Sequence, residues 1–267
     1  MHRAIVYLRF IYKPLTNRIQ LGEGGIALFN VTHTWLATGD IIRTVFSAIL
    51  SAITLCALYG YNDYKDRDVD LINPKKDHPF VQSIILESKL FLLLNLLLSF
   101  SLIVLCGLYM DATHAAFMMV LLGINFVYSN KLKAIVGLDL FIVMAWGGVF
   151  TLLSDVISFK LAILAGIMTG IAHFFQMLLD LDSDKESKIS TTLVRHWDKA
   201  ALVIIILSAI LGAVLLLFSK NPLIAISAVL PVIFYFISSR VMVSWFLSRV
   251  YFFSIWMWML NMIYGGI

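Results

Sequence analysis

Charged residues are scarce in this sequence. Asp, Glu, Lys and Arg make up 13% of the 267 residues, whereas hydrophobic residues make up 61%. An average soluble domain is about a quarter charged and about half apolar, so this composition argues against a water-soluble protein. The sequence therefore predicts an integral membrane protein that is surrounded by membrane lipids.

The small number of cysteines and two missing sequence patterns argue against particular sites, partners and a signal peptide. The only two cysteines, Cys56 and Cys106, lie in apolar runs, which favours packing over a disulfide or a metal site. The basic residues form no stripe with interleaved aromatic side chains, so we expect no nucleic-acid partner. The first twenty residues lack a continuous apolar core with a cleavage site, so we expect no removable signal peptide.

Long apolar runs separated by short polar breaks predict an all-α membrane protein. At about 20 residues per span, the chain has room for nine transmembrane helices in a single domain, residues 1–267. The expected spans are residues 18–38, 42–61, 87–110, 113–129, 135–154, 160–179, 199–218, 222–239 and 247–266.

The basic residues are distributed unevenly between the two sides of this arrangement. If the helices alternate in direction, 17 of the 20 Lys and Arg residues lie on one side, and only Arg43, Lys160 and Lys220 lie on the other. The positive-inside rule makes the first side cytoplasmic, with the N-terminus inside and the C-terminus outside. The two longest polar connections, residues 62–86 and 180–198, are then both cytoplasmic.

These two connections hold ten of the sixteen Asp and Glu residues. If the second span continues as a helix beyond its apolar part, Asn62, Asp66 and Asp70 are spaced i, i+4, i+8 and share one face. Asp63 lies beside Asp66 on that face, whereas Asp68 points elsewhere. The first connection therefore predicts a face of carboxylates at a helix end.

At the end of the sixth span, Asp180 and Asp184 repeat the i, i+4 spacing. Clustered carboxylates repel one another, and as hard oxygen ligands without cysteine they suit Mg²⁺, which commonly bridges carboxylates to substrate phosphates. The sequence therefore predicts a phosphate or diphosphate substrate, with a hydrocarbon tail that suits the apolar surroundings. The basic side chains near the clusters are Arg67, Lys75, Lys76, Lys131, Lys133, Lys185 and Lys188.

A simpler interpretation is that charged residues at helix ends only form a solvated surface. Two regularly spaced clusters on the same side favour a site over this interpretation. Solvated surface remains the expectation for the acids that lie off the two faces, namely Asp68, Asp77, Asp182, Glu186 and Asp198.

Three motifs resemble the UbiA superfamily of intramembrane prenyltransferases. The family pattern N-D-x-x-D-x-x-x-D is matched by Asn62, Asp63, Asp66 and Asp70, with Arg67 as the frequent arginine. The second family pattern, D-x-x-x-D followed by a threonine, is similar to Asp180, Asp184 and Thr191. The stretch "YSNKLK", residues 128–133, resembles the family motif Y-S-x-x-L-K. The order and spacing agree along nearly the whole chain, although Ser183 and Lys188 stand where the second motif usually has glycine.

This resemblance implies a nine-helix bundle around a central cavity, with a Mg²⁺-diphosphate site under a cytoplasmic cap. It implies transfer of a prenyl group from a polyprenyl diphosphate donor to a lipophilic or aromatic acceptor, through an allylic carbocation. The implied metal ligands are Asp63, Asp66, Asp70, Asp180 and Asp184. The implied diphosphate contacts are Asn62, Arg67, Tyr128, Lys131, Lys133 and Lys185. The acceptor-side candidates are Asn17 and His173, for which membrane anchoring and helix packing are the alternative roles.

Three other functions fit parts of the pattern. A terpene cyclase of the same fold needs no second substrate, and the sequence does not separate it from a transferase. A phosphoribosyl-transferring branch of the superfamily is less favoured because its second motif lacks D-x-x-x-D. A transporter also uses intramembrane acids, but these usually lie near the bilayer midplane. The depth of the acids therefore distinguishes an enzyme from a transporter.

Overall fold

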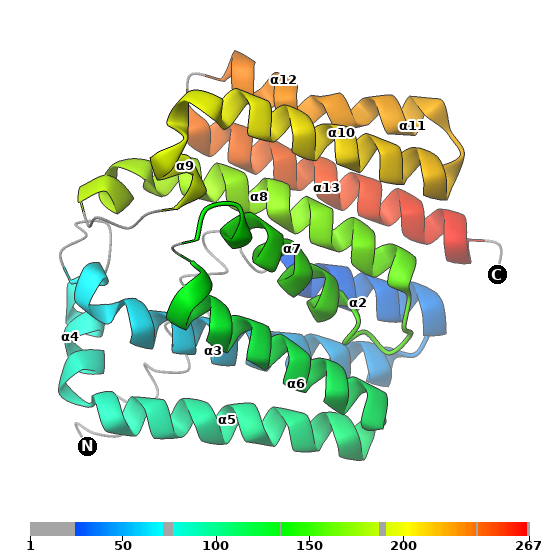
Figure 1. Cartoon of the computed structure of the whole chain (residues 1–267). Coiled ribbons are helices and arrows are strands. Elements are labelled where there is room, and N and C mark those ends of the chain that lie inside the picture. The colour runs from blue at the N-terminus through cyan, green and yellow to red at the C-terminus, as the bar shows by residue number, and fades with distance from the viewer. Residues whose placement is uncertain (1–24, 72–76, 134, 187–190, 239, 266–267) are drawn as a thin grey trace.

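The computed structural model describes residues 25–71, 77–133, 135–186, 191–238 and 240–265, and within these ranges it contains helices and no β-strand (Figure 1). The all-α fold class is therefore confirmed. The α-helices are α2 (Gly25–Thr38), α3 (Ile41–Asp70), α4 (His78–Leu86), α5 (Ser88–Tyr109), α6 (Ala112–Val127), α7 (Leu138–Thr151), α8 (Phe159–Glu186), α9 (Thr192–Arg195), α10 (Ala200–Ser219), α11 (Pro222–Ile226), α12 (Leu230–Ile237) and α13 (Val241–Tyr264). Shorter turns are η1 (Tyr128–Leu132), η2 (Trp197–Lys199) and η3 (Ser227–Val229).

Six helical segments are long and apolar enough to cross a membrane: Ile41–Asp70, Ser88–Tyr109, Ala112–Leu132, Phe159–Asp182, Trp197–Ser219 and Val241–Tyr264. Two shorter apolar segments, Leu138–Thr151 and Pro222–Ile237, coincide with two further predicted spans. The predicted span 18–38 is described only from Gly25 onward, as α2. The count of nine spans and the central cavity therefore stay predictions.

The local sequence explains where two elements depart from the predicted spans. Residues 78–86, expected in a polar connection, form α4, because Asp77 caps its N-terminus and Pro79 occupies its first turn. The predicted span 222–239 is interrupted by the turn η3. Pro231 follows this turn at the start of α12, where a proline that lacks a backbone N–H is tolerated.

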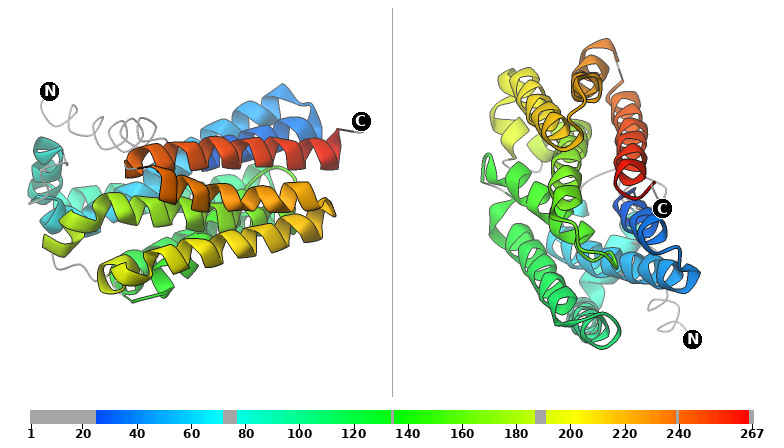
Figure 2. Two further views of the ribbon diagram at one scale, coloured as in Figure 1. Left: turned by 90° about the horizontal axis from the view of Figure 1, so that it is seen from above. Right: turned by 90° about the vertical axis from the view of Figure 1, so that its right-hand side faces the viewer.

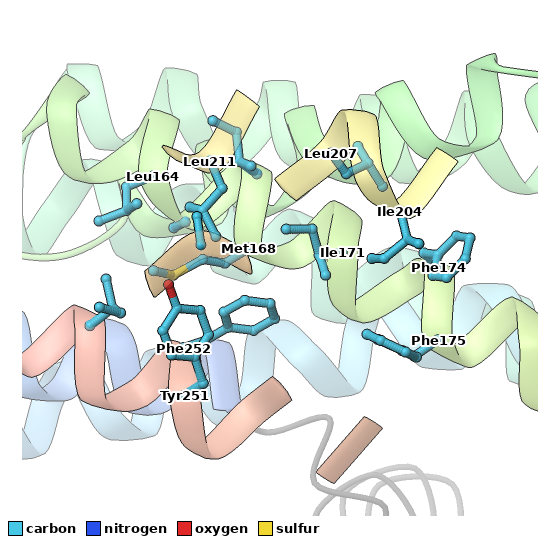
Figure 3. Close-up of a cluster of buried hydrophobic side chains, with 14 of the residues drawn as sticks. Leu164, Met168, Ile171, Phe174, Phe175, Ile204, Leu207, Leu211, Tyr251 and Phe252 are labelled. Atoms are coloured by element: carbon cyan, nitrogen blue, oxygen red, sulfur yellow. The ribbon is translucent and has the colours of Figure 1, made fainter. Parts of the chain in front are cut away.

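The helices lie side by side along the length of the bundle, with α8 packed against α7, α10 and α13 (Figure 2). On α8, Leu164, Met168 and Ile171 are buried against Leu207 and Leu211 of α10 (Figure 3). A second apolar cluster joins α3, α5, α6 and α7. These two clusters fix the positions of α3 and α8, the two helices that carry the acidic motifs.

Small residues allow α7 and α8 to approach closely, as is common between membrane helices. A Cβ atom on Gly166 of α8 would lie 2.6 Å from the backbone oxygen of Met144 in α7. We expect Gly166→Ala to lower the free energy of unfolding by about 1–3 kcal/mol, because backbone cannot move aside as a side chain does. Thermal unfolding in detergent measures this. Gly123→Ala, where a Cβ meets nothing within 4 Å, is the matched control; equal melting temperatures for the two variants would contradict the prediction.

Polar side chains at the end of the bundle opposite the acidic motifs have structural roles. Asp40 and Asp111 accept backbone N–H groups at the starts of α3 and α6. The Asp155 carboxylate pairs with the Arg43 guanidinium at 2.9 Å. His33 lies 2.8 Å from the Ser154 hydroxyl, which links α2 to the connection between α7 and α8. Capping and pairing therefore account for these acids.

Candidate active site

The first acidic motif lies in the last turns of α3. This helix has 30 residues and is about 45 Å long, whereas a bilayer core is about 30 Å thick, so its end extends beyond the apolar region. As predicted, the helix continues to Asp70. Asp63 and Asp70 are buried, whereas the Asp68 side chain is 77% exposed. The burial pattern therefore follows the face that the spacing predicted.

The second motif lies at the same end of the bundle. Asp180 and Asp184 belong to the last turns of α8, which ends near α9, and α3 ends near α4 at the same side (Figure 1). Both side chains are partly buried, whereas Asp182 is exposed. The two predicted carboxylate faces thus come from helices that end together.

The connection between α6 and α7 lies against the first motif. Lys133 donates a hydrogen bond to Asp66, with 2.6 Å between Nζ and Oδ2. Ser129 donates to the Asn62 side-chain oxygen at 3.3 Å. Tyr128 to Leu132 form a turn of π-helix, a rare conformation that is frequent at functional sites. The third motif is therefore in contact with the first.

The charges of Asp66 and Asp184, one from each acidic motif, both affect the pKa of Lys133. Burial by itself would lower the pKa of Lys133, but the charge of Asp66, with a contribution from Asp184, raises the pKa above its ordinary value. Tyr128 makes an edge contact with His173 of α8, at 6.5 Å between ring centroids. Side chains from α3, α8 and the α6–α7 connection thus form one polar site.

The donor set fits Mg²⁺ in its chemistry. The acids of both motifs are hard oxygen ligands, which Mg²⁺ prefers. Among the residues described, no three His, Cys, Asp or Glu side chains lie close enough together to hold a metal ion. Lys133 supplies the positive charge beside Asp66 in this structure. A metal ion that binds Asp66 would therefore have to compete with the Lys133 ammonium group.

Three other predicted site residues are exposed or contact an aromatic ring, and a fourth is not described. The Arg67 guanidinium lies over the Tyr64 ring of its own helix, 4.6 Å from the centroid. Lys131 is exposed. Lys185 is also exposed and lies 5.8 Å from the Trp197 ring centroid. Asn17 lies outside the described residues.

Sequence reasoning missed polar residues that hold the site in place. Asn95 of α5 and Asn125 of α6 are buried and donate to the backbone oxygens of Ala57 and Leu58 in α3, at 2.8 and 3.0 Å. Asp139, at the start of α7, is completely buried and accepts hydrogen bonds from Thr192. A buried asparagine or aspartate inside an apolar span was the available signal.

The chain matches known proteins in sequence and in fold. The model of the UbiA prenyltransferase family matches residues 26–264. A UbiA homolog from Archaeoglobus fulgidus bound to DMAPP and Mg²⁺ has a TM-score of 0.68 at 16% identity, covering 96% of this chain and 99% of that chain. A structure of a UbiA homolog from the same organism bound to GPP and Mg²⁺ gives 0.64 at 15% identity, with the same coverage. No functionally curated protein matches the sequence. Because the family model covers nearly the whole chain, this protein belongs to the UbiA prenyltransferase family.

Proposed function

We propose that this protein transfers a prenyl group from a prenyl diphosphate to a lipophilic or aromatic acceptor in the membrane, with Mg²⁺ as its cofactor. The observation that carries the proposal is the meeting of two carboxylate-bearing helix ends around Lys133 at one end of an apolar bundle. The solved UbiA homologs of the same fold bind DMAPP or GPP with Mg²⁺, which supports both the donor class and the metal.

The acidic residues of the two motifs are the proposed metal ligands: Asp63, Asp66, Asp70, Asp180 and Asp184. Bound there, Mg²⁺ neutralises the charge that develops on the departing diphosphate. Two opposed carboxylate faces provide oxygen ligands on both sides of such a group, which a single cluster does not.

The basic and polar side chains between the motifs hold the diphosphate in this proposal. Lys133 exchanges Asp66 for a diphosphate oxygen, and Tyr128 and Asn62 add hydrogen bonds. The allylic carbon–oxygen bond breaks and its electron pair leaves with the diphosphate. The acceptor then forms a bond to the allylic carbon and loses a proton. His173, which contacts the Tyr128 ring, is proposed to lie on the acceptor side.

The depth of the acids favours an enzyme over a transporter. The acids of α3 lie in its last turns, beyond the apolar part of a helix that is about 45 Å long. Transport sites usually lie near the bilayer midplane beside broken helices. The chain is an integral membrane protein, and we propose that it is one domain, with this end and the N-terminus in the cytoplasm because of the excess of Lys and Arg there.

Mass spectrometry of the purified protein tests the proposal directly. The protein is incubated with Mg²⁺, with DMAPP, GPP or longer prenyl diphosphates, and with or without aromatic and glycerol-phosphate lipid acceptors. Released diphosphate is followed in parallel. We expect a prenylated acceptor that disappears with EDTA and returns when Mg²⁺ is added in excess. Asp66→Ala, purified in the same way, controls for a contaminating enzyme.

Other outcomes have defined meanings. Diphosphate release with a hydrocarbon or alcohol product and no adduct would replace the transferase with the cyclase. No release from any donor by a folded protein would contradict the proposed chemistry and return the phosphoribosyl and transporter functions to consideration.

A further inference from the structure

Asp139 is a completely buried carboxylate that belongs to neither acidic motif. One carboxylate oxygen accepts the Thr192 N–H at 2.7 Å, and the other accepts the Leu140 N–H at 2.8 Å. The Thr192 hydroxyl also donates to Asp139. In each of these contacts an N–H or O–H group donates a hydrogen bond to the Asp139 carboxylate. A buried carboxylate needs such donors.

The direction of the hydrogen bonds explains why the hydroxyl of Thr192 is needed. The Gly137 N–H donates to the Thr192 hydroxyl oxygen at 2.6 Å, so the hydroxyl proton is directed to Asp139. Gly137 has a φ of 82°, a left-handed conformation that glycine adopts without strain. Gly137, Asp139 and Thr192 are therefore joined by hydrogen bonds, and we call these three residues the latch.

The latch joins two connections that carry site residues. Gly137 follows Tyr128 and Lys133 in the α6–α7 connection, Asp139 lies in the first turn of α7, and Thr192 begins α9, downstream of Asp184 in α8. A single buried link thus connects the segment that binds Asp66 with the segment that follows the second motif.

We propose that Asp139 and Thr192 are positioning residues that hold the starts of α7 and α9 together and so keep Lys133 and Tyr128 in place beside Asp66 and His173. This inference rests on the proposed function of the site. In this proposal the latch is itself neither a metal ligand nor a diphosphate contact. Its effect on turnover passes through Lys133.

Two variants break the latch in different ways. Asp139→Asn replaces one carboxylate oxygen with an amide N–H₂, which faces hydrogen-bond donors and cannot accept from them. Thr192→Val removes the hydroxyl that accepts from Gly137 and donates to Asp139. We expect each variant to lower kcat by about tenfold and change the donor KM by less than about threefold, because orientation is lost and the ligands remain. Thr192→Ser, which keeps the hydroxyl, stays within about threefold of wild type in kcat.

A double-mutant cycle separates positioning from a general loss of packing. In a Lys133→Met background, we expect Asp139→Asn to lower kcat by less than about twofold, because the group that it positions is gone. The matched control is Thr54→Val, since Thr54 is a buried threonine whose hydroxyl donates to the Leu50 oxygen of its own helix. This control changes kcat by less than about twofold. A tenfold loss with Lys133 absent, or an equal loss in Thr54→Val, would overturn the proposal.

Amide hydrogen exchange, which needs no substrate, tests whether the latch holds these segments in place. We expect Thr192→Val to increase amide exchange in residues 128–133 and in residues 191–199 together, whereas Thr54→Val leaves both unchanged. Unchanged exchange in residues 128–133 would overturn the latch even if the enzyme is active. If wild type lacks activity with every donor, the proposed function fails, and the exchange result alone decides whether the latch exists.

Discussion

Asp63→Ala, Asp66→Ala and Asp184→Ala are each expected to reduce prenyl transfer by at least about a hundredfold while the protein stays folded. Each substitution removes a carboxylate that the proposal assigns to the metal, and losing one stabilising group for developing charge commonly costs about 10²–10³ in rate. Asp66→Ala also leaves Lys133 without its partner at 2.6 Å. Initial rates of diphosphate release at saturating Mg²⁺ measure the effect.

Exposed acids on the same two helices are the matched controls for these variants. Asp68 and Asp182 are exposed and lie within two residues of Asp66 and Asp184. We expect Asp68→Ala and Asp182→Ala to keep turnover within about twofold of wild type, since Asp182 is exposed and Asp68 makes a long, exposed ion pair with Arg67 at 3.9 Å. Wild-type turnover in any of the three site variants would remove that residue from the site. Equal losses in the controls would show that overall charge, and not metal binding, is responsible.

Lys133→Met is expected to have an effect of similar size, with a distinctive response to Mg²⁺. The substitution removes the ammonium group that pairs with Asp66 and whose pKa the Asp184 charge also raises, so both carboxylates lose that positive charge. Breaking a partly buried ion pair by removing one partner costs about 1–3 kcal/mol. We therefore expect a lower melting temperature, and a larger stabilisation by Mg²⁺ than in wild type, because the metal then replaces a missing cation.

The enzyme kinetics of Lys133→Met are the second measurement. We expect Lys133→Met to lower kcat/KM for the donor by about a hundredfold, because the ammonium group binds the departing diphosphate in the proposal. Lys65→Met, an exposed lysine next to Asp66, is the matched control and should match wild type in both measurements. If Mg²⁺ stabilises Lys133→Met no more than wild type, the metal does not bind between these carboxylates.

Much of the helical architecture follows from short-range patterns in the sequence. Apolar runs predicted the long helices, and the i, i+4 spacing of Asn62, Asp66 and Asp70 predicted a continuing helix face that the structure contains. The exposed Asp68 and the buried Asp63 follow the same periodicity. Family membership was suggested by the motifs and is established by the match over residues 26–264. The roles of the site residues remain predictions.

The remaining features depend on contacts between distant parts of the chain. Asp139 and Thr192 are 53 residues apart, and neither belongs to a pattern that helix periodicity reveals. Lys131 and Lys133 stand in the same motif, but the π-helical turn directs only Lys133 to Asp66. The motif gave no means of choosing between them. Arg67, expected at the diphosphate, packs on the Tyr64 ring, because a stacked guanidinium can be satisfied within its own helix.

The ion pair between Lys133 and Asp66 has a consequence for ligand binding. Mg²⁺ alone must compete with an ammonium group that already occupies Asp66 at 2.6 Å. A diphosphate offers Lys133 another anionic partner, so the donor releases the carboxylate that the metal needs. Such linkage is reciprocal: each ligand raises the affinity of the other by the same factor. The protein should therefore bind metal and donor cooperatively, and magnesium titrated without diphosphate should bind weakly.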